Sequence, residues 1–182
     1  NLNPRRTGLL EILLRMGAEI NVYNRREIGG EPGGDLEIHS AGLVGTTVTA
    51  KEVPLAIDEL PLFALAAAFA RGTSKLRGAA ELRAKESDRI EATVDALRAI
   101  GVRIRGTDDG FVVTGVPTRV RGGRIDSRGD HRIAMLGAIA GLASSEGVRV
   151  DDAGAVAVSF PGFFEMLEAL RDSSPPDGSW TP

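Results

Sequence analysis

Apolar positions recur along this 182-residue chain with two periods, which predict alternating helices and strands. Spacings of three and four residues predict amphipathic helices that end at Gly17 and at Gly101, and another over residues 165–171. Alternating or β-branched stretches predict strands over residues 18–23, 35–39, 44–49, 73–76, 102–104, 111–114, 120–127 and 148–150. The pattern is therefore that of an α/β protein.

Two further predicted helices, over residues 62–70 and 133–143, are apolar on nearly every side. A helix without a polar face is buried in a protein rather than lying on its surface. The Gly-rich residues 27–34 and the polar residues 106–110 are expected to be turns between paired strands. The chain is thus expected to combine buried helices with hairpins.

The pattern repeats within the chain. Residues 13–20 match residues 97–104, each followed by a predicted hairpin, and residues 64–76 match residues 138–150. The repeated unit is strand, helix, strand, helix, strand, strand. Because the buried helices belong to this unit, we expect an inside-out α/β barrel of repeated βαβαββ units, with helices buried and sheets outside.

Composition excludes several classes of protein. The net charge of −3 argues against a generally basic surface for nucleic acid. The absence of cysteine excludes disulfides, thiolate catalysis and cysteine-based zinc sites within the chain, and two histidines do not suggest a His-rich metal site. With no apolar run of about 18 residues and no signal-peptide layout, we expect a cytoplasmic protein without membrane contact.

A polar cluster precedes the second amphipathic helix. Asp88 is expected to be the N-cap, with Glu91 three residues later as in a capping box. Arg89 then falls in the first turn, with Lys85 and Glu86 on the entering loop. Because a helix N-terminus favours anions, these cations predict a phosphate or carboxylate site, with Glu86 close enough to exchange a proton. A solvated, salt-bridged helix start is the alternative that spacing alone leaves open.

Two other predicted helix starts carry charged residues. Asp58 is expected to be the N-cap of the first buried helix, and Asp130, His131 and Arg132 open the second. If the units repeat about an axis, these starts converge on one face and would bind a multiply anionic ligand. Asp58 and Glu86 could then serve as base and acid. A capping aspartate alone is usually structural, so the shared placement carries this prediction.

The stretch Leu-Arg-Ala-Lys-Glu-Ser-Asp-Arg, at residues 82–89, closely resembles the signature of the 5-enolpyruvylshikimate-3-phosphate synthase family. Four other segments look like the same family in the same order. They are Asn-Pro-Arg-Arg-Thr-Gly at 3–8, Ile-Asp-Glu-Leu-Pro at 57–61, Gly-Asp-His-Arg-Ile-Ala-Met at 129–135 and Ser-Phe-Pro at 159–161. The resemblance extends from residue 1 to about residue 172.

The resemblance implies an enolpyruvyl transferase of two domains, with its active site in the cleft between them. Residues 1–172 look like most of the C-terminal domain, and the Ser/Pro/Gly-rich residues 173–182 are expected to be a flexible tail. The implied reaction transfers the enolpyruvyl group of phosphoenolpyruvate to the 5-hydroxyl of shikimate 3-phosphate, without a metal or organic cofactor. The implied partners are these two substrates and the missing N-terminal domain, in a monomeric parent protein.

Roles for individual residues follow from the motifs that match. Asp58 would bind the shikimate ring and take the proton from the substrate 5-hydroxyl. Glu86 would transfer a proton at the phosphoenolpyruvate methylene, and Lys85 would contact shikimate 3-phosphate or the reaction centre. Arg89 and Arg132 would bind the carboxylate or phosphate of phosphoenolpyruvate, since a planar guanidinium suits both groups.

His131 would support this site by position. One departure from the family is Val158, which stands where many members carry lysine, immediately before the Ser-Phe-Pro segment. The N-terminal half of the family's site is also missing, so this chain alone is expected to be inactive.

Two other hypotheses remain open: a sibling transferase acting on a UDP-amino sugar, and a non-catalytic anion-binding or scaffold domain.

Overall fold

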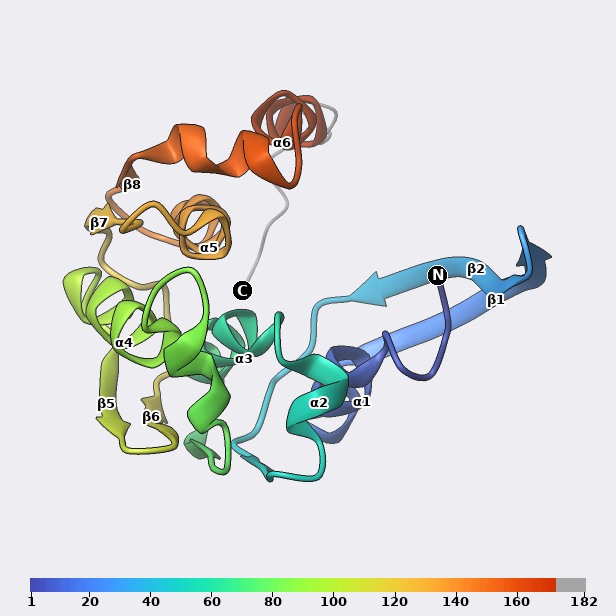
Figure 1. Cartoon of the computed structure of the whole chain (residues 1–182), viewed down its shortest axis with the longest axis horizontal. Helices are drawn as coiled ribbons and strands as arrows, with labels where there is room; N and C mark the ends of the chain where they lie inside the picture. The colour runs from blue at the N-terminus through green and yellow to red at the C-terminus, as the bar shows by residue number, and fades with distance from the viewer. Residues whose placement is uncertain (173–182) are drawn as a thin grey trace.

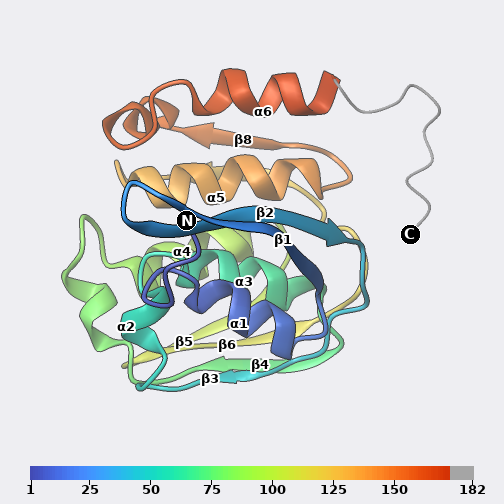
Figure 2. The ribbon, with the colours of Figure 1, turned by 90° about the vertical axis from the view of Figure 1, so that its right-hand side faces the viewer.

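The computed structural model describes residues 1–172. Most of their helices lie inside and most of their strands outside, whereas the last helix lies at the outer edge (Figures 1 and 2). The flexible tail predicted over residues 173–182 lies outside the described residues. The first helix is α1 (Gly8–Arg15), which buries Ile12. Gly17 adopts a φ of 96°, which suits a residue without a side chain and ends this helix region as predicted.

A long antiparallel hairpin of β1 (Glu19–Ile28) and β2 (Glu31–His39) follows and projects away from the helices (Figure 1). The prediction of a turn over residues 27–34 is wrong, because both strands run into that stretch. Only Gly29 and Gly30 turn, with φ of 61° and 81°, the conformation that a two-residue hairpin turn requires. Pairing across the hairpin extends strands that local composition does not favour.

Residues 47–115 form one complete βαβαββ unit. Its elements are β3 (Thr47–Val48), α2 (Val53–Ala56), α3 (Leu60–Phe69), β4 (Gly72–Leu76), the 3-10 helix η1 (Ala80–Ala84), α4 (Arg89–Ala99), β5 (Arg103–Thr107) and β6 (Gly110–Gly115). The sheet order is β3-β4-β6-β5, with β3 parallel to β4 and the other pairs antiparallel. The repeat unit predicted from the sequence is therefore present.

The unit begins again after residue 115. Its elements are β7 (Gly123–Asp126), α5 (His131–Leu142), β8 (Val148–Asp151), the 3-10 helix η2 (Ala153–Val158) and α6 (Phe163–Asp172). Strands β7 and β8 are parallel, as β3 and β4 are. The described residues thus hold a helix and hairpin, one full unit, and the βαβα part of another.

The two helices without a polar face are buried, as predicted. Helix α3 contacts α1, α4 and α5, and α5 also packs beneath β8 (Figure 2). Phe63 of α3 is fully buried, and its ring stacks on Phe111 of β6 with centroids 6.2 Å apart. Burying a side chain of this size contributes about 1.5–3 kcal/mol. This packing fixes the positions at which the inner helices begin.

One of the two predicted N-caps is present, and Asp130 caps a further helix. The Asp88 carboxylate accepts from the Glu91 amide at 3.0 Å, and Asp130 accepts from the Arg132 amide at 2.9 Å. The prediction that Asp58 caps a helix is wrong, because α3 follows Glu59 and has no side-chain cap.

The backbone between α2 and α3 explains why Asp58 does not cap α3. An N-cap residue needs extended dihedral angles, whereas Glu59 has φ −97° and ψ −2°. The Glu59 amide also donates to the Ala56 carbonyl, so the chain turns without extending. The Asp58 carboxylate is therefore free to bond elsewhere.

Candidate active site

Arg89 lies at the centre of three carboxylates from three different segments. Its Nε donates to Asp130 Oδ2 at 2.8 Å, its Nη1 donates to Asp58 Oδ1 at 3.0 Å, and its Nη2 donates to the Glu86 carboxylate. The Arg89 side chain is only 1% exposed. The starts of the inner helices therefore converge, as the sequence predicted, and they converge on one guanidinium.

Local sequence explains why Arg89 points inward. It is the first residue of α4, directly after the Asp88 cap, and its neighbour Ile90 is buried in the core. Asp130 caps α5 with one oxygen and binds Arg89 with the other. Helix packing therefore sets the distance between the Arg89 and Asp130 side chains, and a bidentate carboxylate joins α4 to α5.

Asp130 is fully buried and remains ionised. Burial alone would raise the pKa of its carboxyl, but hydrogen bonds from Arg89, the Arg132 amide and the Ser87 hydroxyl hold that pKa below its ordinary value. The Ser87 Oγ donates to Asp130 Oδ2 at 2.9 Å. Asp130 thus places a negative charge beneath Arg89 at neutral pH.

Arg89, Asp58, Glu86, Asp130 and Arg132 form the Arg89 cluster, and its more exposed side carries Asp58, Glu86 and Arg132. Asp58 is 38% exposed and Glu86 is 52% exposed, so both carboxylates can reach a ligand. Arg132 adds a second cation, with its Nη2 3.2 Å from Asp58 Oδ2 and its Nη1 donating to the Asp58 carbonyl at 3.2 Å. This side pairs two carboxylates able to exchange protons with a guanidinium able to bind an anion.

Two predicted site residues lie beside this cluster without joining it. Lys85 is on the loop before α4, where its Nζ lies 3.6 Å from Glu81 Oε1. His131 is the first residue of α5, is partly buried, and follows Asp130 directly. The structure therefore brings Asp58, Glu86, Arg89 and Arg132 into contact, but not Lys85 or His131.

Sequence reasoning missed Ser87 and the double role of Asp130. Asp130 was predicted only as a charged residue at a helix start, although it is the one carboxylate buried with Arg89. The signal was present in the spacing, because an N-cap aspartate has a second oxygen that a buried cation can bind. Ser87 carried no comparable signal, since a serine before a cap is common on surfaces.

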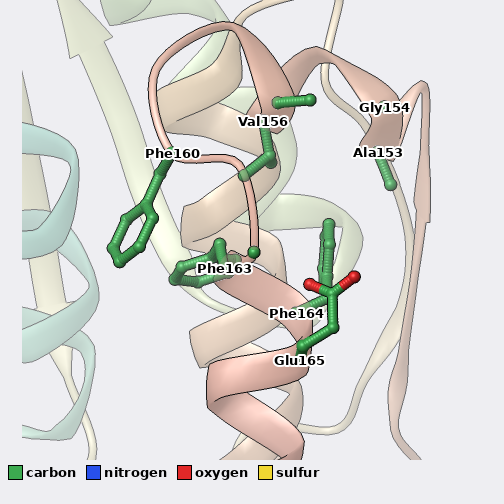
Figure 3. A pocket seen from close by; sticks show the side chains of 9 residues that line it. Ala153, Gly154, Val156, Phe160, Phe163, Phe164 and Glu165 are labelled. Carbon is green, nitrogen blue, oxygen red and sulfur yellow. The ribbon is translucent and has the colours of Figure 1, made fainter.

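An apolar pocket of about 280 Å³ lies elsewhere, between η2 and α6 (Figure 3). Phe160, Phe163 and Val156 surround it, and Glu165 is the charged residue of its lining. A negative side chain among aromatic rings does not suit an anionic ligand. The Arg89 cluster is therefore the stronger candidate for an active site.

Within residues 1–172, no group of three or more His, Cys, Asp or Glu side chains is arranged to hold a metal ion. The three carboxylates around Arg89 are ion-paired with the guanidinium groups of Arg89 and Arg132 instead. In the same part of the chain, no helix is both long and apolar enough to cross a membrane.

The buried helices, outer sheets and converging charged helix starts define a class: an inside-out α/β protein with a cluster of ion-paired side chains where its inner helices begin. The model of the EPSP synthase family (3-phosphoshikimate 1-carboxyvinyltransferase) matches residues 1–167. The chain belongs to this family.

Relatives agree with this assignment. The chain is 49% identical over 170 residues to the 3-phosphoshikimate 1-carboxyvinyltransferase of Desulforudis audaxviator (strain MP104C), covering 93% of this chain and 39% of that protein. It is 51% identical over 170 residues to the one of Legionella pneumophila (strain Paris), with coverage of 93% and 39%. The chain therefore spans 39% of the length of these curated relatives.

Solved structures agree as well. An EPSP synthase from Acinetobacter baumannii matches with a TM-score of 0.87 and 43% identity, covering 92% of this chain and 39% of that chain. The enolpyruvyl transferase NikO from Streptomyces tendae matches with a TM-score of 0.69 at 22% identity, over 91% of this chain and 35% of that one. The second likeness is one of fold alone, and both confirm the predicted inside-out α/β architecture.

Proposed function

We propose that this chain supplies one wall of the active site of an enzyme that transfers the enolpyruvyl group of phosphoenolpyruvate to shikimate 3-phosphate. The observation that carries the proposal is the convergence of Asp58, Glu86 and Arg132 around the buried Arg89. Both proposed substrates are anions, and both need cations placed before they meet. The names of the family and of its relatives support the same reaction.

In the proposed addition step, Asp58 accepts the proton of the shikimate 5-hydroxyl as that oxygen attacks C2 of phosphoenolpyruvate. Glu86, protonated for this step, delivers its proton to the methylene carbon, which becomes a methyl group. The product is a tetrahedral intermediate that still carries the phosphate. The partial exposure of both carboxylates is consistent with contact to a substrate.

In the proposed elimination step, Glu86 takes a proton back from the methyl group as the bond from C2 to the phosphate oxygen breaks. Phosphate leaves, and the enol ether forms on the shikimate oxygen. Asp58 returns its proton to the departing phosphate, directly or through water. The pair is restored to its initial protonation states, as a repeating cycle requires.

The cations of the cluster would bind the substrates. Arg132 would bind the carboxylate or phosphate of phosphoenolpyruvate through the guanidinium that now contacts Asp58. Arg89 would take part only where a substrate anion replaces the half-exposed Glu86 at its Nη2, because Asp130 occupies its Nε and Asp58 occupies its Nη1. Lys85 would reach shikimate 3-phosphate from the loop before α4, and His131 would support Arg132.

The rest of the proposed site lies in another part of the protein. We infer that residues 1–172 belong to a longer protein, because the chain spans 39% of its relatives. The family resemblance implies that they are most of the C-terminal domain of a monomeric parent. An N-terminal domain would then supply the opposite wall of the site. Since phosphorylated substrates do not cross membranes, the reaction would take place in the cytoplasm.

Reassembly of the two parts tests the proposal. The 182-residue chain is assayed alone and mixed with the N-terminal domain of the same protein, with phosphate release from phosphoenolpyruvate and shikimate 3-phosphate as the readout. We expect no turnover by either part and phosphate release by the mixture. Turnover by this chain alone would contradict the shared site. A mixture that associates but releases no phosphate would support a non-catalytic scaffold instead.

A further inference from the structure

Arg83 lies two positions before Lys85 and has no part in the proposed chemistry. Its guanidinium nevertheless makes three hydrogen bonds with three different groups. Its Nε donates to the Asp108 carbonyl at 2.8 Å, its Nη2 donates to the Thr107 carbonyl at 2.8 Å, and its Nη1 donates to Asp88 Oδ2 at 2.5 Å. One side chain thus joins the turn between β5 and β6 to the start of α4.

The same turn also holds the chain that leads into η1. Asp109 Oδ2 accepts from the Gly78 amide at 2.7 Å, and the Asp109 carbonyl accepts from the Ala79 amide at 2.7 Å. The Thr107 hydroxyl donates to Asp109 Oδ1 at 3.3 Å, which fixes the acceptor. The β5–β6 turn therefore contacts the segment before η1 and, through Arg83, the end of η1.

Asp88 is the other end of this connection. Its Oδ1 caps α4 by accepting from the Glu91 amide, while its Oδ2 accepts from Arg83. Lys85 and Glu86 lie between Arg83 and Asp88 along the chain. Both ends of the loop that carries them are thereby attached to regular elements, which limits the positions that the two side chains can reach.

The geometry of these contacts depends on a guanidinium. Arginine presents five N–H groups in one plane, so it can bond to two carbonyls and a carboxylate together. A lysine ammonium is a single point of charge and does not reproduce that planar arrangement. The three acceptors around Arg83 therefore select arginine for its shape as well as for its charge.

We propose that Arg83 is a positioning residue, which holds the loop carrying Lys85 and Glu86 in register with α4 by binding the β5–β6 turn and Asp88. This inference rests on the proposed function, because it gives Arg83 a task in the same site. Arg83 does not touch the Arg89 cluster. Its effect reaches the chemistry through the placement of Glu86, for which displacements of about 1 Å can cost about 100-fold in rate.

The first test uses the 182-residue chain alone and needs no activity. Hydrogen exchange of the amides at residues 84–88 is compared among the wild-type chain, Arg83→Ala, Arg83→Lys and the control Arg77→Ala. Arg77 is an exposed arginine on the preceding loop. We expect exchange at these amides to become about tenfold faster in both Arg83 variants, with the interior of α4 unchanged. Unchanged exchange at residues 84–88 in both Arg83 variants would overturn the proposal.

The second test uses the chain assembled with its N-terminal domain. We expect Arg83→Ala and Arg83→Lys to lower kcat by about 100-fold with KM changed less than about threefold, and Arg77→Ala to match the wild type. Wild-type kcat in the Arg83 variants would overturn the proposal, and so would full rescue by lysine.

The two tests separate two kinds of failure. If the assembled wild-type protein releases no phosphate, the proposed function fails, while the exchange measurement still decides whether Arg83 holds the loop. If Arg83→Ala does not fold, Arg83→Lys is used in its place in both tests, because lysine keeps the aliphatic stem and the charge.

Discussion

One buried guanidinium, that of Arg89, is shared by three carboxylates of unequal exposure. Asp130 is fully buried, whereas Asp58 and Glu86 face the side from which a ligand could approach. A buried cation is tolerated only when it is paired and hydrogen-bonded. Asp130 therefore has a structural role beneath Arg89, and the other two carboxylates remain available for chemistry.

Removing the buried charge of Asp130 tests whether that residue has a structural role. Asp130→Asn leaves Arg89 without its buried counter-charge, so we expect the free energy of unfolding to fall by about 2 kcal/mol. Asp95→Asn is the matched control, because Asp95 is 48% exposed in its ion pair with Arg128 and should change stability by less than about 0.5 kcal/mol. Urea unfolding of both variants gives the comparison. Equal losses in the two variants would contradict the structural role of Asp130.

The ion pair between Asp130 and Arg89 also predicts that stability depends on pH. The pKa of Asp130 is lowered in the folded chain, below the value of about 3.9 in an unfolded one. Its contribution to stability is therefore fully present above about pH 5 and is lost as the pH falls through the folded pKa. The stability difference between wild type and Asp130→Asn should be constant from pH 7 to about pH 5 and shrink below about pH 4. A difference that grows on acidification would contradict this account.

Val158 offers a test by gain of function. Its side chain is 85% exposed, so a lysine can replace it without losing packing. Because the family resemblance implies a lysine at this position, we expect Val158→Lys to lower the KM for phosphoenolpyruvate by about fivefold in the protein assembled with the proposed N-terminal domain. Val158→Gln, similar in length but neutral, is the control. An unchanged KM in Val158→Lys would show that this position lies outside the site.

At the scale of elements, sequence predicted the starts of α4 and α5 correctly but not that of α3. Asp88 and Asp130 cap because the residue before each helix is extended, which matches a simple N-cap pattern. Asp58 precedes a helix entered from the turn after α2, and no local pattern showed that turn. The charged residues were predicted, whereas their meeting at Arg89 depends on helix packing that only the structure reveals.

Close contact between α3 and β6 depends on one glycine. A Cβ on Gly115 would lie 2.1 Å from the Ala70 carbonyl oxygen and 2.3 Å from that of Ala67, so these elements would have to separate. We expect Gly115→Ala to reduce the free energy of unfolding by about 1–3 kcal/mol in urea titrations. Gly42→Ala is the control, since nothing lies within 4 Å of the added Cβ there. A loss in Gly115→Ala no larger than in the control would contradict the observed packing.

At the scale of the whole molecule, the described residues contain one complete repeat unit between two partial ones. In the complete unit, β4 pairs with β3 on one side and β6 on the other. Among residues 1–172, the corresponding strand β8 pairs only with β7. The repeat was visible in the sequence because its buried helices and glycines recur. The sequence did not show which strand pairs with each sheet edge, because that pairing depends on segments distant along the chain.

Association with the proposed N-terminal domain should therefore stabilise this chain. A partner that binds only the folded state raises the melting temperature in proportion to the logarithm of its concentration. At a hundredfold excess over Kd, we expect the Tm of the 182-residue chain to rise by about 5–10 °C. An unrelated protein of similar charge at the same concentration is the control. No rise above that control would contradict a shared interface.

The measurement that tests the central claim most directly is phosphate release by the assembled protein carrying Glu86→Gln. Glu86 is half exposed beside Arg89 and keeps its size in this variant, whereas it can no longer exchange a proton. Glu91→Gln is the matched control, because Glu91 is also exposed but lies in the first turn of α4 rather than on the loop before it. We predict a fall in kcat of about 100- to 10,000-fold in Glu86→Gln, with Tm unchanged and Glu91→Gln fully active. Equal activity in the two variants would contradict the assignment of the Arg89 cluster as the site of proton transfer.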